Sequence, residues 1–568
     1  MNSLFVKVSP HANGQFLVDI QSFIVINLYK LSGSSNLKLK VQSCVDSSPN
    51  SLIVISLNNV PYEFVEKAPE LTEICIWPVI LLQQHVVSGL CSVARQLCKF
   101  SDEKAIQDLL GFREACLAAC AESSVWTKFC EIDMPETINK LLHNNYIQDN
   151  RFNLPEDVFK YEKHLEQPVR IHNIYKIARD SQNDQTINSS IPKKDLKVSH
   201  NYAEGPQVTL ADLILYPCFQ VFFKYCREYL EINDQLQIHL VNAWFQRLEE
   251  SFSLKKITFT SLHIPNKSSI DFLINVPQVD NMSLYKSDPA RTPVTKHTKQ
   301  YKIEAALSLI EGIAIKNDIL PFGFDELFDW TAVPLTANPQ GGALPAKRAN
   351  RKCEQLENLV KATLKVVGNK KYRIADFCSG SGHLGILAAL FLPQCEVILV
   401  ENKERSIDRA KQTISKLNLK NVILVQSNLD YFTGKIQLGL ALHACGLATD
   451  LVLQMCIKNN ADFICCPCCY GGIKDCHQVS YPRSVHFQKI FIENEKQYFN
   501  LAHAADQTHK QENIKTKQGY FCMDVIDTDR KWYAQDCGYE VFLGKLQPVS
   551  CTNKNNLLVG IYNQNISE

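Results

Sequence analysis

The stretch Tyr372-Arg-Ile-Ala-Asp376-Phe-Cys-Ser-Gly380-Ser-Gly382-His-Leu-Gly385 decides the fold of the C-terminal half of this 568-residue chain. A short apolar strand, three glycines and the apolar helix 386–392, stopped by Pro393, follow one another. Glycines let a backbone approach a ligand closely, and a helix N-terminus offers free N–H groups to an anionic group. The order of strand, glycine turn and helix therefore predicts an α/β domain with a cofactor loop.

The next two strands carry the other candidate ligand groups. Strand 395–400 ends in Glu401, at the distance past the glycines where an acid hydrogen-bonds ribose hydroxyls in nucleotide-binding folds. Strand 421–425 leads into Gln426-Ser-Asn428, where a side-chain amide could meet an adenine. We predict Asn428 for that contact, with Asp430 as the second choice.

The glycine spacing admits two kinds of cofactor. It spells G-x-G-x-x-G, which a nicotinamide dinucleotide would also use. However, Asp376 lies four residues before Gly380, and this arrangement resembles motif I of methyltransferases, where the carboxylate helps to hold the methionine moiety. The resemblance implies S-adenosyl-L-methionine as the cofactor. The residues it implies as cofactor-binding are Asp376, Gly380, Ser381, Gly382, Gly385, Glu401 and Asn428. The alternative is a tight turn in a domain that has lost ligand binding.

Two later strands also end in polar segments. Strand 436–442 runs into His443-Ala-Cys-Gly446-Leu-Ala-Thr-Asp450, and strand 462–465 runs into Cys466-Pro-Cys-Cys-Tyr-Gly-Gly472. This pair resembles segments of a methyltransferase group that includes eukaryotic tRNA 2′-O-methyltransferases, which implies RNA as the substrate and a ribose hydroxyl as the acceptor. His443 is our candidate general base, because an imidazole titrates near neutral pH. A capped structural histidine is the alternative.

The densest group of potential metal ligands follows the fifth strand. Its members are Cys465, Cys466, Cys468, Cys469, Cys476 and His477. Cys466 and Cys469 have the C-x2-C spacing of zinc sites, but a second such pair is missing. Because free cysteines are also ordinary small buried residues, we predict no metal site here.

The N-terminal half indicates a different class of fold. Thr209-Leu-Ala-Asp212 is a capping box, and a long apolar helix follows it. Together with a helix that ends at Ala243–Leu248, this segment resembles the glutathione S-transferase C-terminal domain, which implies an all-helical fold for residues 102–264. That domain would also offer a surface for a protein partner.

Residues 1–101 are predicted to form a mixed α/β unit, for which a degenerate thioredoxin-like unit is one alternative. The runs Phe23–Leu28 and Leu52–Leu57 have the Val and Ile content of strands. The Glu-Ser pair with which glutathione transferases grip their peptide is missing at a suitable place after a proline. Glutathione transfer is therefore disfavoured.

The complete order of segments resembles one family. Residues 265–300 are polar and predict a linker, and residues 301–568 are expected to form a Rossmann-like, seven-stranded class I methyltransferase-type domain. A multidomain α and α/β chain of this kind resembles the glutathione S-transferase C-terminal domain-containing proteins. The competing function is a non-enzymatic scaffold that binds the cofactor and docks a protein through its helical domain.

Charge and composition limit the remaining possibilities. With 60 Lys and Arg against 59 Asp and Glu, the chain as a whole is not a nucleic-acid-binding polycation. A local basic segment, 341–352, precedes a helix predicted from Glu354, and its Arg348 and Arg351 are candidate contacts to RNA phosphates. A solvated helix start is the alternative.

Cellular location is predicted from cysteines and apolar runs. The chain has 22 cysteines, and residues 1–10 lack the features of a signal peptide, which favours a reducing compartment. No apolar run approaches the roughly 20 residues that span a bilayer. We expect a cytoplasmic protein without a membrane partner.

Overall fold

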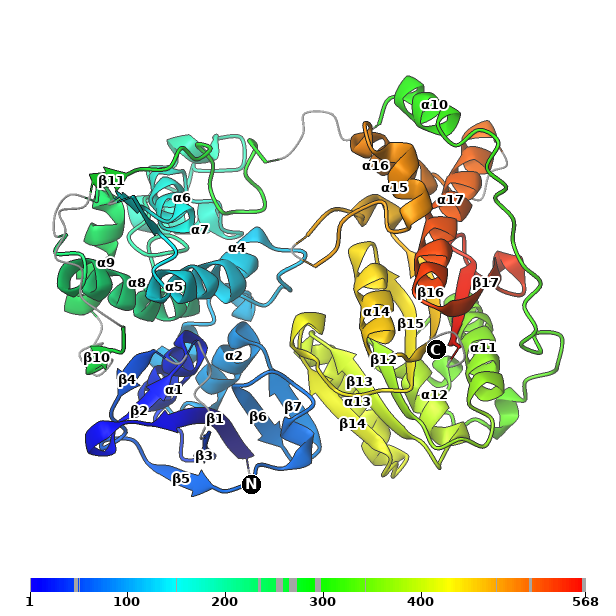
Figure 1. Cartoon of the computed structure of the whole chain (residues 1–568), viewed down its shortest axis with the longest axis horizontal. Coiled ribbons are helices and arrows are strands. Elements are labelled where there is room, and N and C mark those ends of the chain that lie inside the picture. Colours follow the sequence, from blue (N-terminus) through cyan, green and yellow to red (C-terminus); the bar gives the residue numbers. More distant parts are fainter. Residues whose placement is uncertain are drawn as a thin grey trace. The chain divides into compact units, whose positions relative to one another are not determined.

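The computed structural model divides into two compact units, residues 1–294 and 295–568 (Figure 1). It describes residues 2–44, 50, 52–149, 151–232, 236–251, 259–264, 273–291, 298–342, 344–476, 478–509 and 513–563. Both units contain helices and strands, so the chain is a multidomain α/β protein as predicted. None of the helices it describes is both long enough and apolar enough to cross a membrane.

A mixed sheet begins the first unit. Strand β1 (Asn2–Pro10) pairs in parallel with β3 (Leu37–Ser43) and antiparallel with β6 (Val79–Leu82). The other elements of this region are β2 (Phe16–Val18), α1 (Ile20–Ser32), β4 (Ile53–Ile55), β5 (Tyr62–Val65), β7 (His85–Ser88) and α2 (Leu90–Phe100). Whether this arrangement derives from a thioredoxin-like unit stays a prediction.

The strand predicted for Phe23–Leu28 is wrong, because these residues lie in α1. Asp19 caps the helix by accepting a hydrogen bond from the Ser22 backbone N–H at 2.6 Å, and Gly33 ends it in the left-handed conformation. The helix is apolar nearly all round and buried, and a short apolar run of this kind cannot be told from a buried strand by its periodicity. The second predicted run, Leu52–Leu57, does contain a strand, β4.

Helices dominate residues 104–251. They are α3 (Lys104–Asp108), α4 (Val125–Lys128), α5 (Met134–Leu142), α6 (Glu156–Glu166), α7 (Ile174–Gln182), α8 (Leu210–Glu228) and α9 (His239–Ser251). The predicted capping box is present at the start of α8, where the Thr209 N–H donates to the Asp212 carboxylate at 2.8 Å. The same buried carboxylate accepts from the Trp244 indole at 2.8 Å, which ties α9 to α8.

The segment predicted to be all-helical also contains strands. Strands β8 (Ile147–Gln148) and β9 (Arg151–Asn153) pair antiparallel, and β10 (Ser261–Leu262) pairs with β4. The polar stretch predicted as a linker contributes β11 (Leu273–Asn275), which pairs in parallel with β9. In the same stretch the Leu284 N–H donates to the buried His164 ring at 3.0 Å. Hydrogen bonds of the backbone thus order part of this segment, although its polar composition predicted a linker.

The second unit is built on a largely parallel sheet. Its strands pair in the order β14-β13-β12-β15-β16-β18-β17. Their bounds are β12 (Arg373–Phe377), β13 (Glu396–Glu401), β14 (Val422–Gln426), β15 (Leu438–Cys445), β16 (Asp462–Cys468), β17 (Tyr539–Lys545) and β18 (Asn556–Tyr562). Strands β12 to β16 are parallel, and β18 runs antiparallel to both β16 and β17. This is a Rossmann-like sheet, as predicted, and the antiparallel pair β17 and β18 closes it.

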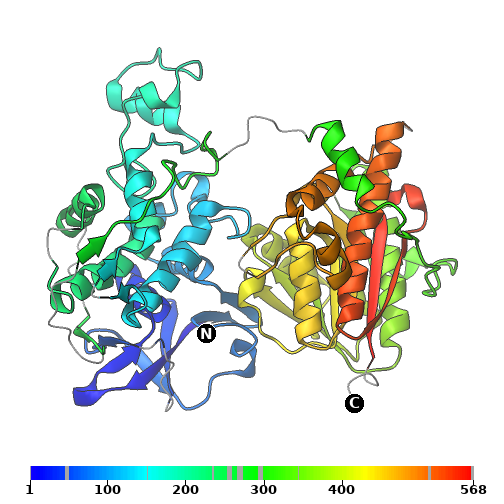
Figure 2. The ribbon, with the colours of Figure 1, turned by 45° about the horizontal axis from the view of Figure 1, so that its top comes forward.

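Helices cover both faces of this sheet (Figure 2). The helices of this unit are α10 (Gln300–Ser308), α11 (Ala346–Val367), α12 (His383–Phe391), α13 (Glu404–Lys416), α14 (Leu447–Lys458), α15 (Val485–Phe491), α16 (Glu495–Ala505) and α17 (Ile514–Asp536), of which α10 packs on α16. On one face Ile374 belongs to the core formed with α11 and α12. On the other face a Cβ at Gly439 would lie 2.3 Å from the Cys456 sulfur, so the glycine lets α14 approach. The carboxyl ends of the parallel strands consequently meet at one edge, where ligands bind in such sheets.

Candidate functional site

The glycine loop after β12 has the conformation that its sequence requires. Gly380 and Gly382 have positive φ angles of 56° and 77°. A Cβ at Gly382 or Gly385 would lie 2.6 or 2.2 Å from the Leu399 side chain, so these two glycines allow the loop and α12 to pack on the sheet. A Cβ at Gly380 would meet nothing within 4 Å. The backbone at Gly380 therefore faces open space that a ligand could occupy.

Asp376 is a buried carboxyl group next to this loop. Its carboxylate accepts a hydrogen bond from the Gly385 backbone N–H at 2.8 Å. Burial raises the pKa of Asp376 to about 7, the Gly385 hydrogen bond opposes this rise, and the charge of Glu401 adds to it. A carboxyl group in this state would be stabilised in its ionised form by a nearby cation.

Glu401 connects two strand ends. At the end of β13 its carboxylate accepts from the backbone N–H of Gly380 at 2.8 Å and from that of Lys403 at 2.9 Å. Asn428, buried just beyond β14, accepts from the Asn402 amide at 3.4 Å. Asp376, Glu401 and Asn428 thus lie at the carboxyl ends of three adjacent strands, and their roles as ligands stay predictions.

Buried polar atoms at the same edge fit a polar cofactor. The hydroxyl oxygens of Ser379, in the loop, and Ser427, after β14, have no hydrogen-bond partner within the described part of the chain. The side-chain oxygen of Gln426 is in the same state. Since buried polar groups are normally paired, a ligand rich in hydroxyl and amine groups would satisfy them.

Sequence reasoning missed Lys352, which lies beside the glycine loop. Its Nζ is 3.1 Å from Nδ1 of His383, the first residue of α12, and the Ser381 hydroxyl is 3.2 Å from the same nitrogen. Burial and then the charge of Lys352 lower the pKa of His383 to about 4. The ring is therefore neutral at pH 7, and the ammonium group of Lys352 is the positive charge at this corner. In the sequence, only the basic character of segment 341–352 indicated a cation here.

His443 lies at the end of β15 with a positive φ of 69°. Its Nε2 is 2.8 Å from Oε1 of Gln355, a residue of α11 that sequence reasoning also missed. The packing around its ring and then the charge of Lys352 lower the pKa of His443. The imidazole is therefore neutral at pH 7, which is the form that can accept a proton.

The basic segment is helical, contrary to the predicted helix start at Glu354. Helix α11 already begins at Ala346, because alanine, lysine and arginine are good helix formers and Pro345 precedes the first turn. Arg348 is exposed, and Arg351 is half-buried on the wall of an open cavity of about 880 Å³. Lys347, Arg351 and Lys545 line this cavity together with Glu354 and Asp524, and Lys545 pairs with Asp524 at 2.6 Å.

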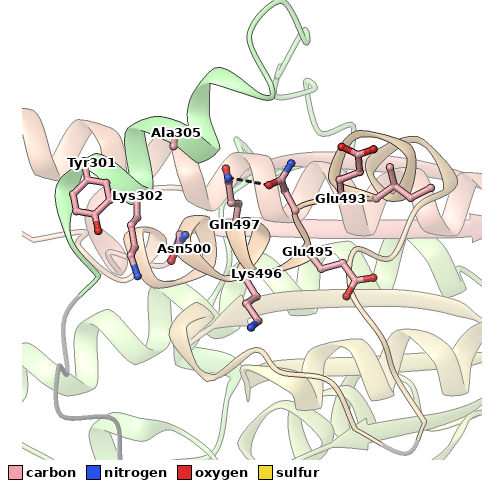
Figure 3. Close-up of a pocket in the computed structure, with 10 residues that line it drawn as sticks. Tyr301, Lys302, Ala305, Glu493, Glu495, Lys496, Gln497 and Asn500 are labelled. Atoms are coloured by element: carbon pink, nitrogen blue, oxygen red, sulfur yellow. Dashed lines mark hydrogen bonds between the residues drawn. The ribbon is translucent and has the colours of Figure 1, made fainter.

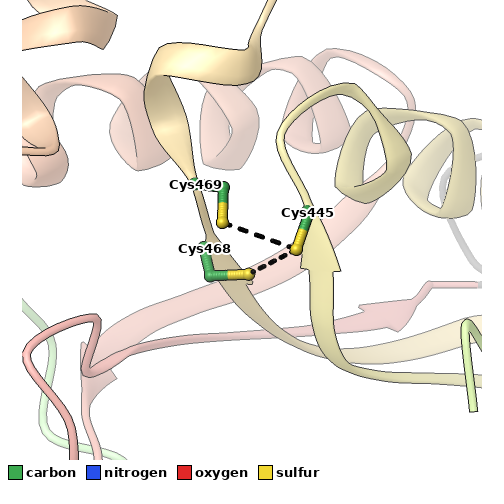
Figure 4. A group of neighbouring side chains, drawn as sticks. All are labelled: Cys445, Cys468 and Cys469. Carbon is green, nitrogen blue, oxygen red and sulfur yellow. Dashed lines mark hydrogen bonds between the residues drawn. The ribbon is translucent and has the colours of Figure 1, made fainter. Parts of the chain in front are cut away.

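The cysteines that come together are not the pair with the C-x2-C spacing. The Cys445 sulfur lies 3.4 Å from that of Cys468 and 3.5 Å from that of Cys469 (Figure 4). Cys466 is buried and instead lies 3.5 Å from the carbonyl oxygen of Lys554. The Cys466–Cys469 pair is therefore not formed, and His477 lies outside the described residues.

A second cavity, of about 750 Å³, lies between α10 and the segment 492–500 (Figure 3). Gln497 donates to Asn494 at 3.3 Å on its wall. Its charged lining residues are of both signs: Lys302, Glu493, Glu495 and Lys496. None of the predicted cofactor-binding residues lines it, so it is separate from the predicted cofactor site.

Comparison with known proteins identifies the class of this unit. Residues 348–476 match the family model described as a methyltransferase domain. This range contains the glycine loop and all five parallel strand ends. The second unit is thus a methyltransferase domain, and its cofactor is S-adenosyl-L-methionine, as predicted.

The chain belongs to the family of glutathione S-transferase C-terminal domain-containing proteins. It is 38% identical over 496 residues to the homolog from Drosophila melanogaster, covering 84% of this chain and 83% of that one. It is 33% identical over 574 residues to the human protein, covering 87% of each. A shorter match, 31% identical over 77 residues, joins 14% of this chain to 34% of the ribosomal RNA small subunit methyltransferase G of Thermotoga sp. (strain RQ2).

Proposed function

We propose that the chain is an S-adenosylmethionine-dependent methyltransferase that acts on RNA at a ribose hydroxyl, with β12 to β18 as a seven-stranded class I sheet. The observation that carries the cofactor part is the position of two buried carboxylates on the glycine loop: Asp376 accepts from Gly385, and Glu401 accepts from Gly380, whose backbone faces open space. Asp376 would hold the methionine amine, Glu401 the ribose hydroxyls and Asn428 the adenine. The bound cofactor supplies a methyl group on a positively charged sulfur.

His443 is the base in this proposal. The side-chain oxygen of Gln355 can only accept a hydrogen bond, so the Nε2 of His443 that faces it carries a proton. Nδ1 is then the basic nitrogen of a neutral ring. It would take the proton from the substrate hydroxyl as the oxygen attacks the methyl group. Gln355 fixes the tautomer and orientation of the ring.

Three observations support RNA as the substrate. Lys347 and Arg351, on the wall of the cavity beside α11, are cations of the kind that meet phosphates. The short match to a ribosomal RNA methyltransferase points to the same substrate class. The Asp/Asn-Pro-Pro-Tyr/Phe loop of amino-methyltransferases is replaced at the end of β15 by His443-Ala-Cys-Gly446, which favours a hydroxyl over an amine.

The proposed location is the cytoplasm. All 22 cysteines are free thiols, in keeping with a reducing compartment of this kind.

The test is transfer of an isotope-labelled methyl group from the cofactor to an RNA pool, followed by nuclease digestion and mass spectrometry of the nucleosides. We expect 2′-O-methylated nucleosides from the parent chain. His443→Ala should lower the rate about 100-fold or more, as loss of a general base does, while S-adenosylhomocysteine binding is unchanged. Full turnover in that variant would exclude His443 as the base.

The affinity for RNA, measured at several salt concentrations, tests the contribution of the basic segment. Neutralising Arg348 and Arg351 should lower the slope of log affinity against log salt concentration for single-stranded RNA by about 1.4, or about 0.7 for each lost phosphate contact. An unchanged slope would show that these two arginines do not contact RNA phosphates and are solvated surface residues. Cofactor binding without transfer to any RNA would favour the scaffold function, with a protein partner on the helical region.

Proton release on cofactor binding tests Asp376. In the free protein the carboxyl group is half ionised near pH 7. A cationic ligand favours the ionised form, so binding below pH 7 should release a proton. The affinity for the cofactor should then fall about tenfold between pH 8 and pH 6, because one group with a pKa of about 7 must ionise. Calorimetry in buffers of different ionisation enthalpy measures the release, and a pH dependence that persists in Asp376→Asn would contradict the assignment.

A further inference from the structure

Three thiols from two neighbouring strand ends converge at the carboxyl edge of the sheet. Cys445 ends β15, and Cys468 and Cys469 lie at the end of β16 (Figure 4). Their sulfur atoms all lie within 4.8 Å of one another. We propose that these three cysteines form a zinc site with an open fourth position. The proposal is independent of whether the chain methylates RNA.

The spacing of the sulfur atoms suits this metal. Zinc–thiolate bonds of about 2.3 Å in a tetrahedron place neighbouring sulfurs roughly 3.8 Å apart. Cys445 lies 3.4 Å from Cys468 and 3.5 Å from Cys469, so a shift of a few tenths of an ångström would make room for the ion. A disulfide would require sulfurs at about 2.05 Å and would leave one of the three thiols over.

The backbone holds the three cysteines in place through bonds that do not involve their sulfurs. Cys469 has a left-handed φ of 52°, which is uncommon for a residue other than glycine. The turn that follows it is fixed to the end of α16, because the Tyr470 and Gly471 N–H groups donate to the Asp506 carboxylate at 3.1 and 2.8 Å. On the other strand, the Gly446 N–H donates to the Cys468 carbonyl at 2.9 Å. The site is thus organised before an ion binds.

The exposure of the cluster determines the kind of site. Cys445 and Cys469 are exposed, and Cys468 is buried beneath them. Among the residues that the structure describes, no histidine, aspartate or glutamate joins the three sulfurs as a fourth ligand. Structural zinc sites are closed by four protein ligands, whereas three ligands and one exchangeable position are typical of sites that bind a water or a substrate atom. Cys445, one of the two exposed ligands, follows the proposed base His443 by two residues.

The first test is the metal content of the full-length chain, purified with a reductant and without chelator. Mass spectrometry of metals should find about one zinc per chain. Each of Cys445→Ser, Cys468→Ser and Cys469→Ser should lose most of it. The matched control is Cys476→Ser, a half-buried cysteine outside the cluster, which should keep its zinc. S-adenosylhomocysteine binding verifies that each variant is folded.

A second measurement identifies the ligands directly. X-ray absorption of the zinc-loaded chain should show three sulfur neighbours at about 2.3 Å and one oxygen or nitrogen neighbour. Cobalt substituted for zinc should give a thiolate-to-metal charge-transfer band that the Cys445→Ser variant weakens. A chain without stoichiometric zinc after loading, zinc that survives in all three variants, or a Cys445–Cys468 disulfide in its place would overturn the proposal.

Discussion

Replacing Glu401 with alanine is expected to weaken S-adenosylhomocysteine binding about 100-fold, or about 2.7 kcal/mol. The carboxylate accepts hydrogen bonds from the backbone of both Gly380 and Lys403, and it is our ribose ligand. Hydrogen bonds to a charged group contribute about 1.5 to 3 kcal/mol each. The substitution removes those that order the loop together with those that would hold the cofactor. Calorimetric titration measures the loss.

The same strand provides the control. Glu396 lies at the amino end of β13, where it pairs with Arg373 at 2.5 Å and is partly exposed. Glu396→Ala removes an acid from the same strand but from the opposite edge of the sheet, so the affinity should stay within twofold. Glu401→Gln, which keeps one acceptor oxygen, should give an intermediate affinity. Parent-like binding by Glu401→Ala would show that this residue does not hold the cofactor.

The cofactor loop was predictable because its parts are local in sequence. The strand, the glycines and the acid of the next strand follow one another, and parallel strands must bring their carboxyl ends to one edge. Asp376 and Glu401 therefore lie at neighbouring strand ends, where the sequence placed them. The structure leaves their role as ligands to experiment.

The partners of these residues were not predictable in the same way. Lys352 meets His383 across 31 residues, and Gln355 meets His443 across 88. Both contacts arise because α11 packs beside the strand ends, and a helical pattern specifies which face is apolar without specifying what that face covers. Likewise, the cysteine cluster needed the pairing of β15 with β16, which brings Cys445 opposite Cys468.

Arg530→Met is expected to destabilise the second unit by about 3 to 5 kcal/mol. The arginine is fully buried in α17, where its guanidinium lies 2.6 Å from Asp450 and 2.9 Å from Asp527. Methionine has a similar size, so the packing changes little. It would leave two buried carboxylates without their cation, and an unpaired buried charge costs more free energy than the lost ion-pair contacts alone. Hydrogen exchange in peptides from α17 measures the loss of stability in this part of the unit.

Two variants separate the charge from the packing. Lys365→Met breaks an exposed pair with Glu326 at 2.8 Å and should leave exchange unchanged, because water screens such pairs. Adding Asp450→Asn and Asp527→Asn to Arg530→Met removes the stranded charges and should restore part of the protection. If Arg530→Met alone exchanges like the parent, the ion-pair network does not stabilise this unit.

The network also connects stability to the proposed chemistry. Arg530 lies 3.4 Å from the Gly446 carbonyl, and Asp527 accepts from the Tyr470 hydroxyl at 2.6 Å, so it fixes the loops after both β15 and β16. The proposed cofactor site lies at the other strand ends, and a ligand at 100 times its dissociation constant contributes only about 2.7 kcal/mol. Since this is less than the expected loss, saturating S-adenosylhomocysteine should slow exchange in Arg530→Met without returning it to the level of the parent.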